Sequence, residues 1–169
     1  MNIENMKIIS IDDNKTNLLI MESYAKILKL NISSFLNPLE AVEELEKNDY
    51  DLIIVDYMMP EMNGIEVIQK VRETNQTIPI IMLTAVGDDM ELQIKALEVG
   101  ANDFLNKPIN APAFKARIIN MLKLRKAQLL IENKALLLED EVKKATLRLK
   151  ESEHEALQML GKASEYKDP

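Results

Sequence analysis

Short apolar runs alternate with amphipathic segments over the first 122 residues, and Gly and Pro fall between them. The runs have the length of strands, while the segments between them repeat apolar residues at helical spacing. We expect strands at Lys7–Ile11, Ile32–Phe35, Leu52–Val55, Ile80–Leu83 and Asp103–Leu105. We expect helices near Thr16–Leu28, Pro38–Lys47, Gly64–Glu73, Met90–Val99 and Ala111–Lys123. This alternation predicts parallel strands with right-handed crossovers, and so a doubly wound α/β sheet.

Several residues mark the ends of the expected helices. Thr16 and Asn110 are residue types that commonly start helices, and Pro112 is suited to a first helical turn. Gly100 is suited to a helix exit.

A different pattern begins near residue 123. Neither Gly nor Pro occurs between Ala113 and Leu160, so a helix throughout this stretch would span roughly 70 Å at about 1.5 Å per residue. A lone helix of that length needs a partner. Two interleaved series of residues spaced by seven predict a coiled-coil seam. They are Leu124, Ile131, Leu138, Ala145, Ser152 and Met159, and Gln128, Ala135, Val142, Leu149 and Ala156.

Charged residues beside this seam favour a parallel homodimer. Lys134 with Glu139, and Arg148 with Glu153, have the spacing of charge pairs between two parallel helices. The alternative is a single helix that folds back on its own domain. We therefore expect a domain at residues 1–122 and a helical coiled-coil linker at residues 123–169, leading toward an output domain.

Composition narrows the class of protein. The 169-residue chain has a formal net charge of −7 and a pI of about 4.9, which argues against binding to nucleic acid or to anionic membranes. It has no cysteine, and its N-terminus lacks a signal-type apolar stretch. No apolar run approaches membrane-spanning length. We expect a cytoplasmic protein.

The candidate chemistry lies where the expected strands end. Asp12 and Asp13 follow the first strand, Asp56 the third, Thr84 the fourth and Lys107 the fifth. In a parallel sheet these ends converge on one edge, where ligands bind. Three carboxylates at contact distance repel one another, and a hard cation with oxygen ligands removes that repulsion. Mg²⁺ needs only one or two protein carboxylates.

These groups suit phosphoryl transfer. Asp56 could attack phosphorus and form an acyl phosphate, while Asp13 and Asp56 hold Mg²⁺ and Asp12 reaches it through water. Lys107 would pair with one phosphoryl oxygen and Thr84 would donate its hydroxyl to another. Each residue taken singly is also common in turns or helix caps. Their placement at four strand ends favours the joint interpretation.

The N-terminal part resembles the receiver domain of bacterial two-component response regulators. The resemblance extends from about Lys7 to Leu122, and its motifs are highly specific. They are Asp12-Asp13, Asp56-x-x-Met59-Pro60-x-Met62-x-Gly64, Thr84-Ala85, and Gly100-Ala101-Asn102-Asp103-Phe104-Leu105-Asn106-Lys107-Pro108. The resemblance implies a flavodoxin-like sheet of strand order 2-1-3-4-5. It also implies that Asp56 accepts a phosphoryl group from a histidine kinase or a phosphotransfer protein.

The resemblance assigns further roles. The backbone carbonyl of Met58 becomes a ligand of Mg²⁺, and Ala85 joins Thr84 in the phosphoryl-binding and switch region. Phe104 stands at the position of the switch aromatic, which is often Tyr in the family and swings between exposed and buried positions. Phe104 has no hydroxyl that could form a hydrogen bond in either position. Met58 and Val86 flank the path of the water that hydrolyses the acyl phosphate.

Two further expectations follow from the resemblance. Lys107-Pro108 should be a cis peptide, the isomer that proline makes accessible. The segment from Glu155 to Pro169 resembles the entry helix of HD-GYP domains, which hydrolyse cyclic di-GMP. This second resemblance implies that the output domain is a cyclic di-GMP phosphodiesterase.

Three functions compete at this stage. The first is a phospho-accepting signalling domain, which catalyses only its own phosphorylation and dephosphorylation and is otherwise not an enzyme. The second is a Mg²⁺-dependent phosphatase with an Asp nucleophile, although the haloacid-dehalogenase type needs an acid where this chain has Met58. The third is a coiled-coil scaffold with an inactive receiver, which leaves the complete set of site residues unexplained.

Overall fold

The computed structural model describes residues 3–85 and 90–165. The chain divides into two compact units, Met1–Ala127 and Gln128–Pro169. The expectation that residues 123–169 form a linker toward an output domain stays a prediction.

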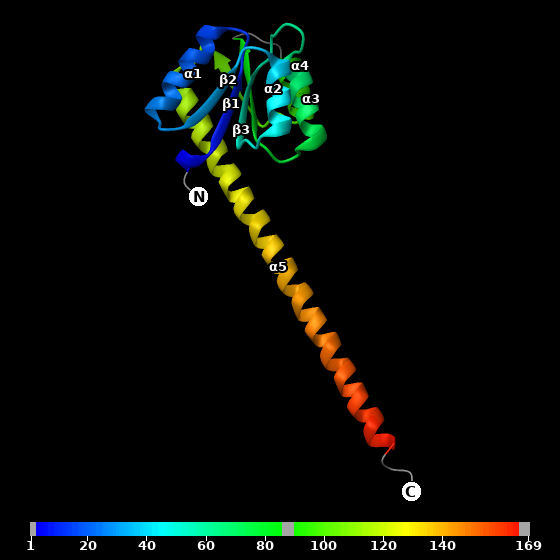
Figure 1. Ribbon diagram of the computed structural model, residues 1–169. Coiled ribbons are helices and arrows are strands. Elements are labelled where there is room, and N and C mark those ends of the chain that lie inside the picture. Colours follow the sequence, from blue (N-terminus) through cyan, green and yellow to red (C-terminus); the bar gives the residue numbers. More distant parts are fainter. Residues whose placement is uncertain (1–2, 86–89, 166–169) are drawn as a thin grey trace. The chain divides into compact units, whose positions relative to one another are not determined.

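The first unit is a five-stranded parallel sheet of order β2-β1-β3-β4-β5, which confirms the predicted fold (Figure 1). Its strands are β1 Lys7–Ile11, β2 Asn31–Phe35, β3 Leu52–Asp56, β4 Ile80–Ala85 and β5 Asp103–Lys107. Its helices are α1 Lys15–Ile27, α2 Pro38–Lys47, α3 Gly64–Thr74, α4 Met90–Glu98 and the first part of α5, which spans Ala111–Glu165. A short 3-10 helix, Ile3–Asn5, precedes β1.

Three strands extend further at their carboxyl ends than the sequence predicts, and β2 begins one residue earlier. Asp56, Thr84 and Lys107 lie within β3, β4 and β5 rather than after them. Pairing between neighbouring strands explains the difference, since Asp56 pairs with Leu83, Thr84 with Asn106, and Ala85 with Lys107. The site residues are consequently held by the ladder itself rather than by loops.

Asparagine side chains begin most of the helices. Asn14, not Thr16, caps α1, and its side chain accepts a hydrogen bond from the Thr16 backbone N–H. Asn63 caps α3 in a reciprocal pair with Glu66, and Asn110 accepts from Ala113, as the sequence predicts. Asparagine is a preferred cap because its carbonyl oxygen satisfies an otherwise unpaired N–H of the first turn. These caps fix where each helix leaves the sheet edge.

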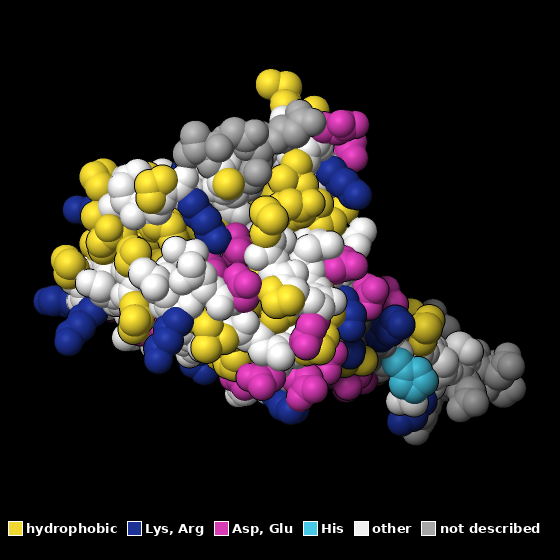
Figure 2. Space-filling model, turned by 90° about the horizontal axis from the view of Figure 1, so that it is seen from above, with side chains coloured by type: hydrophobic (Ala, Val, Ile, Leu, Met, Phe, Trp, Pro, Cys, Tyr) yellow, Lys and Arg dark blue, Asp and Glu magenta, His cyan; other side chains and the backbone are white. Residues whose placement is uncertain are grey.

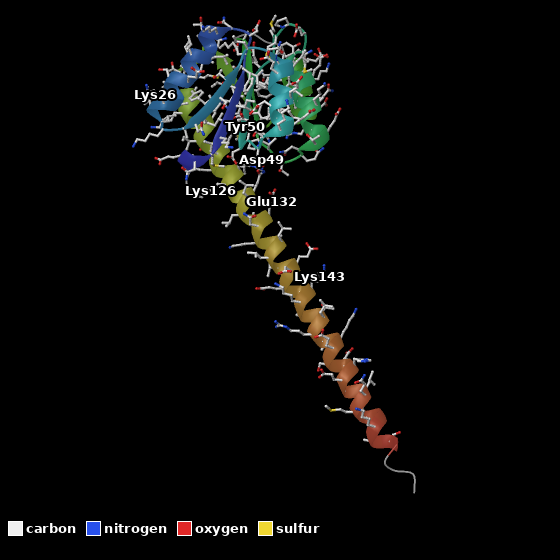
Figure 3. All side chains as sticks on the ribbon, in the orientation of Figure 1. Lys26, Asp49, Tyr50, Lys126, Glu132 and Lys143 are labelled. Atoms are coloured by element: carbon white, nitrogen blue, oxygen red, sulfur yellow. The ribbon has the colours of Figure 1, made fainter. Side chains whose placement is uncertain are left out.

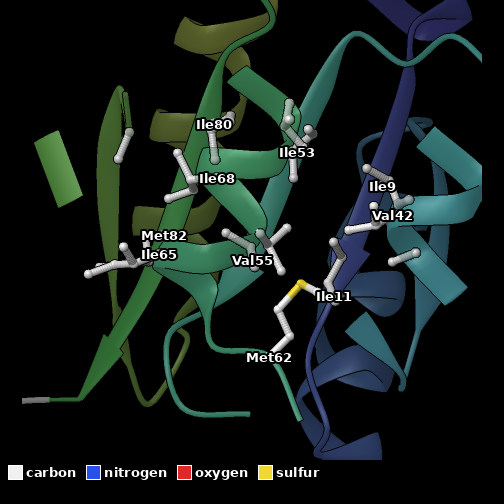
Figure 4. Close-up of a cluster of buried hydrophobic side chains, with 14 of the residues drawn as sticks. Ile9, Ile11, Val42, Ile53, Val55, Met62, Ile65, Ile68, Ile80 and Met82 are labelled. Atoms are coloured by element: carbon white, nitrogen blue, oxygen red, sulfur yellow. The ribbon is translucent and has the colours of Figure 1, made fainter. Parts of the chain in front are cut away.

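One face of the sheet carries the main core. Alternate strand residues point toward α2, α3 and α4, because side chains alternate between the two faces of a strand. Figure 4 shows this cluster, in which Met62 reaches in from the loop before α3. Its labelled members are Ile9, Ile11, Val42, Ile53, Val55, Met62, Ile65, Ile68, Ile80 and Met82.

The opposite face packs against α1 and the first turns of α5. Phe114, Ile118 and Leu122 are fully buried at helical spacing, and the ring of Tyr24 lies 5.6 Å from that of Phe114. The buried stripe continues to Arg125, which donates a hydrogen bond to the Thr77 hydroxyl. This part of α5 therefore belongs to the first unit.

The second unit is the remainder of α5. Every described side chain from Leu130 to Ser164 is exposed, and side chains leave the helix on all sides around the labelled Glu132 and Lys143 (Figure 3). Within 3–85 and 90–165, no helix combines the length and the apolar character needed to cross a bilayer.

Gly64 allows α3 to start directly behind the end of β3. A Cβ at this position would lie 2.5 Å from the carbonyl oxygen of Asp56, and the Gly64 N–H bonds to the carbonyl of Tyr57 at 2.9 Å. A side chain here would have to displace backbone rather than a flexible side chain. The missing side chain of Gly64 therefore lets the start of α3 lie against the Asp56 backbone.

We predict that Gly64→Ala lowers the free energy of unfolding by about 1–3 kcal/mol, the usual range for overpacking. Urea unfolding followed by circular dichroism would measure it. Gly161→Ala is the matched control, because nothing lies within 4 Å of a Cβ at that helical position. The control should leave the first unit unaffected and favour helix by about 0.5–1 kcal/mol. Equal stability of Gly64→Ala and wild type would contradict the proposed close approach.

Candidate functional site

The carboxyl ends of the strands meet at one end of the first unit, which Figure 2 shows from above. Acidic side chains gather near the middle of this face, with a basic side chain beside them and hydrophobic side chains around them. Four of the five strands deliver the predicted polar residues to this edge, because parallel pairing brings their ends to the same level.

Asp12 is fixed by its neighbours just beyond β1. Its backbone N–H bonds to the carbonyl of Phe35, which extends the β1–β2 pairing by one step. Its Oδ1 accepts from the backbone N–H of Asn14 at 2.8 Å, and its Oδ2 accepts from the side-chain amide of Asn17 at 2.9 Å. The carboxylate is fully buried and well satisfied.

Asp56 is the last residue of β3 and is almost fully buried, with 4% of its surface exposed. Tyr57 continues the ladder, since its N–H bonds to the carbonyl of Leu83 at 3.2 Å. The strand and the turn to Gly64 together hold the Asp56 carboxylate at the sheet edge.

Lys107 links these two carboxylates. Its ammonium lies 2.7 Å from Oδ1 of Asp56 and 3.1 Å from Oδ2 of Asp12. Both aspartates are buried, so the attraction is screened less by water than at an exposed surface. The Lys107–Pro108 peptide bond is cis, as predicted.

The electrostatics of the pair follow from burial and charge. Burial raises the pKa of Asp56, the hydrogen bond from Lys107 lowers it, and the charges of Asp12 and Asp13 raise it, with a raised pKa as the result. Burial alone would lower the pKa of Lys107, but its bonds and attraction to Asp56 and Asp12 outweigh burial and raise that pKa. Lys107 therefore stays protonated. The ionised form of Asp56 is less stable in the folded protein than in water, because burial opposes its charge.

Asp13 completes a group of three carboxylates. One oxygen each from Asp12, Asp13 and Asp56 lies within 4.8 Å of the other two, and the Asp13 side chain is exposed. Oxygen donors of this kind suit Mg²⁺. Three carboxylates and the Lys107 ammonium leave two net negative charges, which is the charge that one divalent cation would balance. The residues fit a magnesium site.

Thr84 and Phe104 occupy the neighbouring strands. Thr84 is buried, and its hydroxyl donates a hydrogen bond to the side-chain oxygen of Asn106 at 3.0 Å. Phe104 is half-buried and packs against the core cluster. Ala85 is exposed at the end of β4 and pairs with Lys107. In this arrangement the Thr84 hydroxyl is engaged with β5.

Of the two residues expected to modulate dephosphorylation, Met58 lies in the described part of the chain and Val86 does not. Met58 follows β3, and 69% of its surface is exposed. Val86 lies outside the described residues. The roles expected for Met58 and Val86 stay predictions.

Sequence reasoning missed Asn14, Asn17 and Asn106. Asn17 and Asn14 hold Asp12, and Asn106 engages Thr84. Asn106 immediately precedes Lys107, and Asn17 follows Asp13 by about one helical turn, so their places in the sequence offered a signal. Asparagine is common in turns and caps, however, and its partner is decided by the fold.

Comparisons with known proteins agree with this geometry. Residues 8–119 match the family model of the response regulator receiver domain. The chain is 37% identical, over 83% of its length, to the cyclic di-GMP phosphodiesterase response regulator RpfG of Xanthomonas campestris, and 30% identical, over 96%, to a cyclic di-GMP phosphodiesterase of Thermotoga maritima. It spans 37% and 45% of those proteins. The solved receiver domain of a Francisella response regulator is 28% identical, with a TM-score of 0.66, covering 70% of this chain and 98% of that one.

We predict that Asp56→Asn raises the melting temperature by a few degrees at pH 7 without divalent ions, because burial disfavours the ionised carboxylate. A native pKa raised above the unfolded value means that stability falls as pH rises through this window. The advantage of the variant should therefore shrink as the pH is lowered toward about 4, where unfolded Asp is half-protonated. Scanning calorimetry over a pH series would measure it.

Asp49→Asn, at an exposed position before β3, is the control and should change little. Mg²⁺ at about 100 times its Kd should stabilise the wild type by about 2.7 kcal/mol and Asp56→Asn by much less. A wild type that gains nothing from Mg²⁺ would contradict the magnesium site.

Proposed function

The chain belongs to the response regulator receiver family, and from that premise we propose that Asp56 accepts a phosphoryl group from a histidine kinase or a phosphotransfer protein in a Mg²⁺-dependent reaction. The observation that carries the proposal is the ammonium of Lys107, which lies 2.7 Å from Asp56 and 3.1 Å from Asp12 beside Asp13. This arrangement supplies a buried carboxylate nucleophile, a fixed cation and oxygen ligands for a second cation.

The transfer forms one bond and breaks one. An oxygen of Asp56 forms a bond to phosphorus as the bond from phosphorus to the donor histidine nitrogen breaks, and the electron pair stays on that nitrogen. Lys107 neutralises charge on the phosphoryl group, and Thr84 donates its hydroxyl to a phosphoryl oxygen. Bound Mg²⁺, held by Asp13, Asp56, the Met58 carbonyl and, through water, Asp12, would offset the remaining negative charge.

We further propose that phosphorylation controls a cyclic di-GMP phosphodiesterase output of the HD-GYP type. Two relatives of this chain are named cyclic di-GMP phosphodiesterases, and the chain spans less than half of each. The resemblance of the segment from Glu155 onward to the entry of such domains supports the same output, although residues 166–169 lie outside the described part.

We expect Asp56→Asn to abolish labelling by acetyl phosphate and Mg²⁺, because it removes the nucleophile. Asp12→Asn should mainly weaken the Mg²⁺ dependence of labelling. Intact-mass spectrometry would measure both, with one added phosphoryl group per wild-type chain. Continuous turnover of acetyl phosphate would favour a phosphatase, and undiminished labelling of Asp56→Asn would rule out this acceptor.

We predict a phosphoryl group that lasts many minutes or more. Met58 and Val86 have apolar side chains that cannot hold an attacking water by hydrogen bonds. Met58→Asn with Val86→Glu should shorten the lifetime, measured as decay of the phosphorylated mass after the donor is removed. Ile27→Asn, at an exposed position at the far end of α1, is a control that should leave it unchanged. A wild-type lifetime of seconds would refute the prediction.

We also propose that the chain forms a parallel homodimer through α5. From Ile131 onward the seam residues are exposed in the single chain, including Ile131 at 67% and Leu149 at 62%. An exposed helix of this length gains stability by burying an apolar stripe. Lys134 facing Glu139, and Arg148 facing Glu153, would give attractive pairs in a parallel arrangement. A second copy is therefore the partner that this surface fits.

Sedimentation velocity at tens of micromolar tests the dimer. Leu138→Asp, on the seam, should give monomers, whereas Leu147→Asp, an exposed leucine off the seam, should not. A chain cut after Ala127 keeps the buried Arg125 and should remain a folded, phosphorylatable monomer. A full-length chain that stays monomeric with and without phosphorylation would overturn the proposal.

A further inference from the structure

Thr84 and Asn106 form a hydrogen bond across β4 and β5 that the receiver chemistry leaves unexplained. The two residues are direct partners in the parallel register, and the Thr84 hydroxyl donates to the Asn106 side-chain oxygen at 3.0 Å. Thr84 is buried, with 1% of its surface exposed, whereas Asn106 is exposed. The contact therefore joins a buried site residue to a side chain that water can reach.

A threonine hydroxyl has only one proton to donate. While it donates to Asn106, the Thr84 hydroxyl cannot donate to a phosphoryl oxygen on Asp56. The hydroxyl proton of threonine turns about the Cβ–Oγ bond, and the oxygen itself moves only by rotation about χ1 between staggered positions. The proposed function thus requires that the contact seen here be broken.

We propose that Asn106 is a positioning residue that holds Thr84 in the unphosphorylated arrangement and thereby weakens the response to phosphorylation. The inference rests on the proposed function, because it concerns the same acceptor. Asn106 competes with the phosphoryl group for one proton, so it sets part of the free energy that separates the two arrangements.

The exposure of Asn106 determines how strongly its hydrogen bond to Thr84 opposes phosphorylation. When Thr84 turns away, water can replace it at the Asn106 amide, so no buried polar group is left unsatisfied. The contact therefore has the modest net strength of a neutral hydrogen bond, corresponding to a factor of roughly two to ten in an equilibrium. A factor of this size shifts the balance between the two arrangements of Thr84 but does not prevent phosphorylation from changing that balance.

Asn106 also connects the site to Phe104. The two side chains lie on the same face of β5 because they are two residues apart, and Phe104 packs against the core cluster. Lys107, the next residue, contacts Asp56 and Asp12. Release of Thr84 from Asn106 therefore occurs on the strand that carries both the site lysine and the switch aromatic.

The experiment measures binding of beryllofluoride, which mimics the phosphoryl group on an aspartate, to the full chain with Mg²⁺. Fluorine NMR would give the affinity. Asn106→Ala removes the acceptor and should raise the affinity by roughly two- to tenfold. Asn106→Ser keeps a shorter acceptor and should lie between Asn106→Ala and wild type. Circular dichroism would establish that each variant is folded.

Thr84→Val provides the control, because it keeps the shape of threonine and lacks the hydroxyl. In that background Asn106→Ala should have no effect, so the double-mutant cycle isolates the proposed contact. An unchanged or weaker affinity of Asn106→Ala, or an equal gain in the Thr84→Val background, would overturn the role of Asn106 alone. A wild type that binds no beryllofluoride and takes no label from acetyl phosphate would overturn the proposed function as well.

Discussion

The contact of the Lys107 ammonium with two buried carboxylates is the interaction on which this site depends. Asp12 directly follows β1 and Asp56 ends the neighbouring β3, so the sheet itself forces their charges together. At about 4 Å, two like charges repel by about 4 kcal/mol at an effective dielectric of 20. The ammonium of Lys107, which β5 holds two strands away from β3, offsets this repulsion. Its single charge does not balance three carboxylates, and the negative charge that remains fits one divalent cation.

The surrounding backbone keeps this unfavourable arrangement in place. Asn14 and Asn17 satisfy the oxygens of Asp12, and the close approach of Gly64 fixes the carbonyl of Asp56. The continuous β3, β4 and β5 ladders hold Asp56, Thr84 and Lys107 at one level. Three of the five site residues lie on strands, which position side chains more precisely than loops do. The hydrogen bond from Thr84 to Asn106 is the part of this framework that we propose breaks on phosphorylation, because water can replace Thr84 at the exposed Asn106 amide.

The second unit differs from the first because its apolar side chains are exposed rather than buried. Its helix carries leucine, isoleucine and valine side chains that remain exposed in the single chain, so its stability depends on what covers them. In the proposed dimer, alanines at positions 135, 145 and 156 would bury little area, so the association of two such helices would be weak and easy to bias. A signalling element needs only a few kcal/mol between its states. A marginal seam is suited to that requirement.

The sequence pattern alone predicted the parallel sheet and the convergence of Asp12, Asp13, Asp56, Thr84 and Lys107, because strand-end residues of a parallel sheet share one edge whatever packs around them. The strand order was implied by the resemblance to receiver domains, and the structure has that order. The first and last residues of elements were less certain, since pairing with a neighbour lengthened β3, β4 and β5 and Asn14 displaced Thr16 as the cap. Only the tertiary structure decided that Lys107 contacts both aspartates and that Thr84 faces Asn106. Those contacts join residues between 22 and 95 positions apart, and their geometry depends on side-chain directions and strand register that no local pattern encodes.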